Sequence, residues 1–206
     1  MRPYHVAVVG SGPSGFFAAA SLLKFADAKA ATDDPVEVRI DMLEMLPTPW
    51  GLVRSGVAPD HPKIKTVTAQ FDKVADDPRF RFFGNITVGE HVQAPELSER
   101  YDAVIYAIGA QSDRPLGIPG EELEGSVAAV DFVGWYNAHP HFAAMNPDVT
   151  QDRAVVVGNG NVALDVARIL AKHAEDLLPT EIPANVQAGL EASAVTDVHV
   201  FGRRGP

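Results

Sequence analysis

The chain has 206 residues, a formal net charge of −10 and no cysteine. Because cysteine is absent, disulfides, thiolate zinc sites, Cys-ligated iron–sulfur clusters and cysteine nucleophiles are excluded, and any redox chemistry must come from a bound cofactor. The negative charge disfavours nucleic-acid binding, and the sequence shows neither a cleavable signal nor the roughly 20 apolar residues of a membrane span, which predicts a cytoplasmic protein.

The first predicted elements form a βαβ unit with a dinucleotide fingerprint. Residues 5–9 are continuously apolar, as is typical of a buried parallel strand, and they lead into Gly10-Ser11-Gly12-Pro13-Ser14-Gly15 and an apolar helix. A second strand is predicted over 36–43. In this context the fingerprint is expected to bind a pyrophosphate, through residues that include Gly10, Gly12, Ser14 and Gly15.

Glu44 follows the second strand of this unit, at the place where an acidic side chain accepts hydrogen bonds from a ribose. A carboxylate there also repels a 2′-phosphate, so the first site suits FAD or NAD rather than NADP. The alternative interpretation is a solvated carboxylate at the end of a strand.

Residues 47–62 form a Pro- and Gly-rich segment, and loops of this length within compact domains are usually functional or disordered. Gly51 permits main-chain groups to approach a planar ring closely. Asp60-His61 would place a titratable group near such a ring, although a structural role for His61 fits the sequence equally well.

The sequence between this loop and residue 109 predicts one helix and three strands. Apolar residues recur at helical spacing over 64–74, and strands are predicted over 80–83, 86–88 and 101–109. Gly109, a candidate cofactor contact, ends the last strand and is followed by turn residues. This pattern predicts two domains, 1–109 and 110–206.

The second domain is predicted to repeat the design of the first. After a helix over 127–137, an apolar run leads into Gly158-Asn159-Gly160-Asn161-Val162-Ala163, a helix to about residue 173 and a strand over 195–201. Arg203 and Arg204 follow this strand, where guanidinium groups bind a 2′-phosphate. The second site therefore suits NADP, unless this pair is a solvated charge cluster. His139-Pro140-His141 lacks a third ligand nearby, so no metal site is predicted.

Together, residues 10–15, 49–62, 158–165 and 203–206 resemble the adrenodoxin reductase family of FAD-containing ferredoxin–NADP reductases, above all its mycobacterial type. The resemblance implies an α/β fold of two Rossmann-like dinucleotide-binding domains, of the glutathione-reductase-like flavoprotein type. It implies FAD in the first domain and NADP in the second. Hydride would pass from NADPH to FAD, and single electrons would then pass to an iron–sulfur ferredoxin.

The resemblance also implies roles for individual residues. Glu44 would bind the FAD ribose, and main-chain groups of Leu52 and Val88 would contact FAD, with Gly15 at the pyrophosphate. His61 and Asp165 would lie near the junction of flavin and nicotinamide, as modulators of hydride transfer. The NADP-binding set would comprise Asn159, Gly160, Asn161 and Val162 at the pyrophosphate, Gln111 nearby, and Arg203 and Arg204 on the 2′-phosphate.

Family members are longer than this chain, which resembles their N-terminal part, so the second domain is expected to be incomplete. Two other functions are open at this point. One is another flavoprotein with two dinucleotide sites, such as the reductase-like subunit of glutamate synthase, and the other is a non-catalytic nucleotide-binding module. The missing cysteines argue against a disulfide reductase, whose chemistry needs a redox-active cysteine pair.

Overall fold

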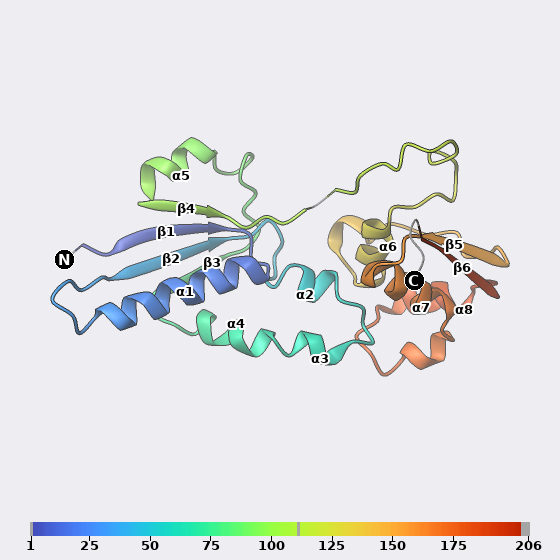
Figure 1. The fold of residues 1–206 in the computed structure, drawn as a ribbon, viewed down its shortest axis with the longest axis horizontal. Coiled ribbons are helices and arrows are strands. Elements are labelled where there is room, and N and C mark those ends of the chain that lie inside the picture. The colour runs from blue at the N-terminus through green and yellow to red at the C-terminus, as the bar shows by residue number, and fades with distance from the viewer. Residues whose placement is uncertain (1, 111, 203–206) are drawn as a thin grey trace. The chain divides into compact units, whose positions relative to one another are not determined.

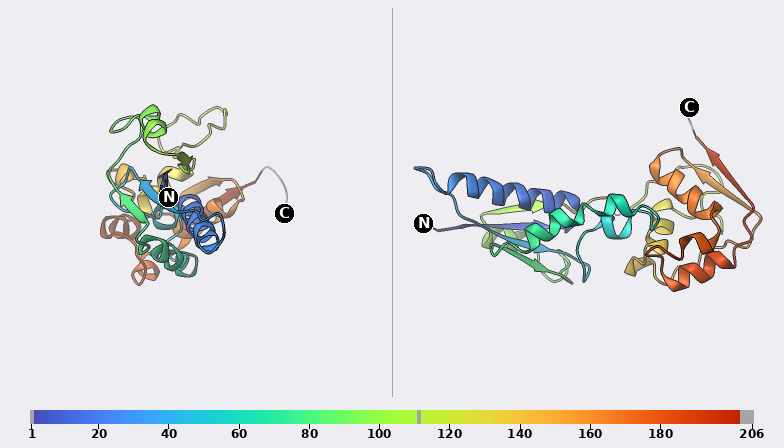
Figure 2. Two further views of the ribbon diagram at one scale, coloured as in Figure 1. Left: turned by 90° about the vertical axis from the view of Figure 1, so that its left-hand side faces the viewer. Right: turned by 90° about the horizontal axis from the view of Figure 1, so that it is seen from below.

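A computed structural model describes residues 2–110 and 112–202, and the chain divides into two compact units. Unit 1 comprises Met1–Arg54 and Lys63–Ala110, and unit 2 comprises Ser55–Pro62 and Gln111–Pro206. The sequence places residues 55–62 in the first domain, whereas the structure groups them with the second unit. Figures 1 and 2 show the fold within each unit.

Unit 1 is built on a four-stranded sheet with the strand order β3-β2-β1-β4, in which every pairing is parallel. The strands are β1 (Tyr4–Val9), β2 (Val38–Leu43), β3 (Phe80–Phe83) and β4 (Ala103–Tyr106). The strand order reverses between β1 and β4, and such a switch point is where open α/β sheets bind ligands, beyond the carboxyl ends of the strands.

Helices cover this sheet on both faces. The longest, α1 (Pro13–Lys29), packs with α4 (Thr68–Ala75) along one face (Figure 1). Between these helices Phe16 and Phe71 stack with their ring centroids 4.7 Å apart. On the other face α5 (Ala94–Arg100) contributes Leu97 to a smaller buried cluster. The short helices α2 (Leu52–Ser55) and α3 (Pro62–Lys65) lie between β2 and α4 in the chain.

Two predicted elements of unit 1 are wrong. The helix expected over 64–74 is divided into α3 and α4, and Ile64 is exposed while Phe71 and Val74 are buried. The strand expected over 86–88 is absent from the described structure, where Val88 makes an isolated bridge to Val92. Helical spacing and short apolar runs do not determine where an element ends.

Unit 2 contains a two-stranded parallel sheet of β5 (Arg153–Val157) and β6 (Asp197–Phe201), connected through α7 (Asn161–Ala171). The other helical elements are α6 (Ala129–Tyr136), η1 (Pro140–Phe142), η2 (Ala174–Leu177) and α8 (Ala184–Glu191). Val156 faces a core formed with α6, α7 and α8, whereas Val155 and Val157 on the opposite face are exposed. Within the described residues, no helix has the length and apolar character that a bilayer crossing requires.

Candidate functional site

The turn between β1 and α1 is closed by glycine. Gly10 has a φ of 100°, and a Cβ there would lie 2.5 Å from the carbonyl oxygen of Ala107. A Cβ on Gly15 would collide with the carbonyl oxygen of Gly10. Side chains at these two positions would therefore push the turn open, which explains the first and third glycines of the fingerprint.

Gly12 has a different environment, because a Cβ at this position would meet no atom of the described residues within 4 Å. Gly12 is the N-cap of α1, Pro13 is the first helical residue, and Ser14 lies in the same turn. This first turn holds no acidic residue and no side chain caps it. A helix start with an uncapped first turn, no acid and open space at its N-cap suits an anion, which the free N–H groups and the positive end of the helix dipole attract.

Glu44 is directed into this turn. Leu43 pairs with Val9, so Glu44 and Gly10 follow neighbouring strands at the same edge of the sheet. One oxygen of the Glu44 carboxylate, Oε2, accepts hydrogen bonds from the backbone N–H of Ser11 at 2.9 Å and from its hydroxyl at 2.6 Å. The other, Oε1, accepts from the backbone N–H of Leu46 at 3.0 Å.

The Glu44 side chain is therefore buried and held in one orientation, with the residue only 8% exposed. This excludes the alternative interpretation of a solvated carboxylate at a strand end. A carboxylate offers about four acceptor positions, and three are occupied within the chain. The remaining position on Oε1 can accept a hydrogen bond from a ribose hydroxyl.

The segment at Trp50-Gly51 lies directly against the glycine turn. The backbone N–H of Trp50 donates to the carbonyl of Ser11 at 2.9 Å, and a Cβ on Gly51 would lie 2.8 Å from the Cα of Gly12. Trp50 has a φ of 92°, which is unusual for a side chain of this size. The Arg54 guanidinium packs over the Trp50 ring, 4.5 Å from its centroid.

The structure thus brings together Gly10, Gly12, Ser14, Gly15, Glu44 and Gly51 around one turn of unit 1. Leu52 begins α2 next to this group and is 64% exposed. Val88 packs against the cluster of Val9, Leu43 and Leu97 on the face of α5. Gly109 has a φ of 67° just after β4.

The second fingerprint repeats this design in unit 2. The backbone N–H of Gly158 donates to the carbonyl of Phe201 at 2.7 Å, and Gly158 has a φ of 132°. Gly160 is the N-cap of α7, and a Cβ there would meet no described atom within 4 Å. Asn159, Asn161 and Val162 surround this helix start, which carries no acidic residue in its first turn. Gln111, Arg203 and Arg204, which the sequence assigns to the same ligand, lie outside the described residues.

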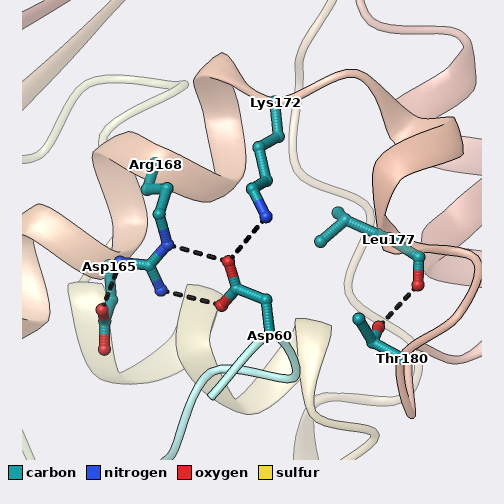
Figure 3. A network of polar contacts seen from close by, with 6 residues as sticks. All are labelled: Asp60, Asp165, Arg168, Lys172, Leu177 and Thr180. Carbon is teal, nitrogen blue, oxygen red and sulfur yellow. Dashed lines mark hydrogen bonds and ion pairs between the residues drawn. The ribbon is translucent and has the colours of Figure 1, made fainter.

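Asp60 and Asp165 belong to one network of ion pairs in unit 2, shown in Figure 3. Arg168 donates from Nε and Nη2 to the two oxygens of Asp60, both at 2.8 Å, and from Nη1 to Asp165 at 2.7 Å. Lys172 lies 3.0 Å from the Asp60 carboxylate. The sequence analysis does not identify Arg168 or Lys172, although the spacing of 165 and 168 places these two residues on one face of α7, and Lys172 is the C-cap of this helix.

The Arg168 guanidinium lowers the pKa of Asp60 well below its ordinary value of 3.8. This hydrogen bonding outweighs desolvation, which acts to raise the pKa, and Lys172 lowers it further. Asp60 in turn raises the pKa of Arg168 above its ordinary value, so the pair stays charged across the neutral range. The side chain of Asp60 is only 8% exposed, so solvent screens this pair little.

The network is expected to lose its contribution to stability in acid. A carboxyl whose pKa is lower in the folded chain stabilises the fold above its unfolded pKa, and this stability is lost as the pH falls towards the folded value. We expect the free energy of unfolding of the wild type to exceed that of Asp60→Asn by about 2 kcal/mol at neutral pH, with the difference shrinking below about pH 4. Urea unfolding across this range is the measurement, and a difference independent of pH would contradict the ionised pair.

Tyr136 on α6 is fully buried, and its hydroxyl finds no hydrogen-bond partner among the described residues. Burial raises the pKa of Tyr136 above its ordinary value, with the charge of Asp165 acting in the same direction. The hydroxyl is therefore neutral at physiological pH. Its burial is unfavourable, because it loses hydrogen bonds to water and gains none within the described residues.

Tyr136→Phe is expected to raise the free energy of unfolding by about 1 kcal/mol, because it removes an unpaired buried hydroxyl. Tyr101→Phe is the matched control, since the Tyr101 hydroxyl donates to Asp41 at 2.8 Å. The control should lower the same free energy by about 1 kcal/mol. Urea unfolding of both variants checks the pair, and an equal loss in each would show that the Tyr136 hydroxyl is bonded.

Comparison with known proteins identifies similar chains. Residues 4–200 match the family described as pyridine nucleotide-disulphide oxidoreductase. The NADPH-ferredoxin reductase FprA of Mycobacterium tuberculosis is 66% identical over 206 residues, which cover 100% of this chain and 44% of that protein. The mitochondrial NADPH:adrenodoxin oxidoreductase of Arabidopsis thaliana is 46% identical, with 100% and 41% covered.

A solved structure of M. tuberculosis FprA in complex with NADPH has the same fold as this chain, with a TM-score of 0.95 at 67% sequence identity. The match covers 100% of this chain and 44% of the solved one. The predicted fold class is confirmed by this likeness and by the parallel sheet of unit 1. The chain spans less than half the length of the relatives that it matches.

Proposed function

Because the chain belongs to the pyridine nucleotide-disulphide oxidoreductase family, we propose that it is the dinucleotide-binding part of a flavoprotein ferredoxin–NADP reductase. The observation that carries the proposal is the repeated helix start, at Gly12 and again at Gly160, where the N-cap has open space and the first turn has no acid. Two such starts suit two dinucleotides. The names of the relatives support NADPH and a ferredoxin as the electron donor and acceptor.

We propose that FAD binds unit 1, whose residues suit two parts of this cofactor. The space at Gly12 admits a pyrophosphate to the N–H groups of α1, and the fourth acceptor position of Glu44 suits a ribose hydroxyl. Bound FAD would supply the conversion that the reaction needs, because it accepts a hydride and gives up single electrons. The loop at Gly51 and Leu52, with Val88 and Gly109, would surround the remainder of the cofactor.

NADP is proposed for unit 2. Gly158, Asn159, Gly160, Asn161 and Val162 would hold its pyrophosphate at the start of α7. Arg203 and Arg204 would bind the 2′-phosphate, with Gln111 nearby. His61 and Asp165 would act on hydride transfer as modulators, since this step depends on alignment more than on a nucleophile. A cytoplasmic location remains a prediction.

The test is to purify the protein, supply FAD and compare the reduction of an iron–sulfur ferredoxin by NADPH and by NADH. Retention of flavin absorbance after gel filtration and faster reduction with NADPH are the expected results. A protein that takes up no flavin contradicts the proposal. Flavin uptake with NADPH oxidation, but without electron transfer to any ferredoxin, would favour another two-dinucleotide flavoprotein.

A further inference from the structure

The segment Ser55–Pro62 has an unusual place in the chain. It belongs to unit 2, while the residues on either side of it, Arg54 and Lys63, belong to unit 1. Within the described residues, no backbone hydrogen bond joins this segment to the remainder of unit 2, and His61 donates only within the segment, to Ala58 at 3.0 Å. Side chains must therefore hold it in place.

Ala58 and Pro59 are buried, and Asp60 is ion-paired. Ala58 is fully buried in the core of unit 2, where a methyl group gives little attachment. Asp60 is bonded more firmly, because both of its oxygens accept from the planar guanidinium of Arg168 and one also pairs with Lys172 (Figure 3). A bidentate pair of this kind fixes orientation as well as distance.

The ion pairs of Asp60 also restrict the backbone of His61, which is the next residue in the chain. Neighbouring Cα atoms are about 3.8 Å apart, so clamping one residue leaves the next little freedom. Pro62 follows immediately and fixes its own φ. The same guanidinium also donates to Asp165, the second proposed modulator of hydride transfer. One arginine thus connects the carboxylate next to His61 with the carboxylate of Asp165.

We propose that Asp60 is a positioning residue, which clamps the segment Ser55–Pro62 to α7 so that His61 keeps a fixed place beside the second dinucleotide site. Its role in catalysis rests on the proposed function, whereas the clamp itself does not. The helix to which Asp60 is paired begins at the second fingerprint, where the NADP pyrophosphate would bind. Arg168 is the other half of this clamp.

The first test measures the clamp without any cofactor. Hydrogen–deuterium exchange of the His61 amide, which donates to the carbonyl of Ala58, is expected to be at least about tenfold faster in Asp60→Asn than in the wild type, because the clamp keeps this turn closed. Unchanged exchange at this amide overturns the clamp.

The structure offers a matched control in unit 1. Arg79 also holds two carboxylates, donating to both oxygens of Asp77 at 2.9 and 2.7 Å and to Asp27 at 2.7 Å. The side chains of Arg79 and Arg168 are 27% and 30% exposed. Asp77→Asn removes a comparable ion pair and is expected to leave exchange of the His61 amide unchanged. Faster exchange there in the control would show a general loosening and overturn the assignment to Asp60.

The second test separates positioning from stability in the FAD-loaded protein. In Asp60→Asn, the limiting rate of flavin reduction by NADPH in rapid mixing should fall about 10- to 100-fold, as expected for a misplaced group, while the dissociation constant of NADPH stays the same. Asp77→Asn should match the wild type in both. Equal limiting rates in Asp60→Asn and wild type overturn the positioning role. A wild type that binds no FAD contradicts the proposed function alone, and the exchange comparison still decides the clamp.

Discussion

Replacing Gly12 with alanine is expected to lower the affinity for FAD about 10- to 100-fold without unfolding unit 1. Gly12 has φ −75° and ψ −178°, a conformation that any residue adopts, and a Cβ would meet no described atom within 4 Å. The methyl group would instead occupy the space through which a pyrophosphate reaches the N–H groups of α1. The cost to the fold is that of a poorer N-cap, about 1 kcal/mol or less.

Flavin retention and urea unfolding measure these two effects separately. Gly160→Ala is the matched control, because it is the equivalent N-cap of α7 and also has open space. It should leave FAD affinity unchanged and weaken NADP instead. Wild-type FAD affinity in Gly12→Ala would place the pyrophosphate elsewhere. Gly15→Ala should differ from both, because its Cβ would collide with the Gly10 carbonyl and disturb the turn itself.

Replacing Arg203 and Arg204 together with glutamine is expected to have the largest effect on cofactor choice. A hydrogen bond to a charged group contributes about 1.5–3 kcal/mol, so losing two such partners should lower kcat/KM for NADPH by about 100-fold or more. The value for NADH, which lacks the 2′-phosphate, should change little. The ratio of the two is therefore the informative measurement.

Arg153→Gln is a control for the removal of one exposed arginine, since Arg153 lies at the start of β5 with a side chain that is 69% exposed. It is expected to leave the ratio of NADPH to NADH use unchanged. Equal losses with NADPH and NADH in the double variant would refute the assignment to the 2′-phosphate.

Local patterns predicted the parts of the structure that depend on neighbouring residues. The apolar run before Gly10 became β1, the fingerprint became the turn and the start of α1, and Glu44 follows β2 at the same edge. A parallel βαβ unit brings these together by its own geometry, so the glycine spacing was sufficient. The sequence could not show that Ser11 orients Glu44, since that depends on side-chain rotamers.

Contacts over long sequence separations were not predictable in this way. Asp60 and Arg168 are 108 residues apart, and no local pattern pairs them. In the sequence Asp60 stands out only as the neighbour of His61, and Arg168 only as one residue of a predicted helix. The division of the helix over 64–74 into α3 and α4 could not be predicted either. Ile64 has the spacing of a core residue, but in the folded chain it is exposed.

The insertion of Ser55–Pro62 into unit 2 also limits how such proteins can exchange their domains. A chimera made by joining two parents at one crossover after Ala110 would combine this segment from one parent with α7 from the other. The Asp60 of the first parent would then have to meet the cations of the second. A functional chimera would therefore need Asp60 and Arg168 in both parents. Otherwise residues 55–62 and the second unit would have to come from the same parent.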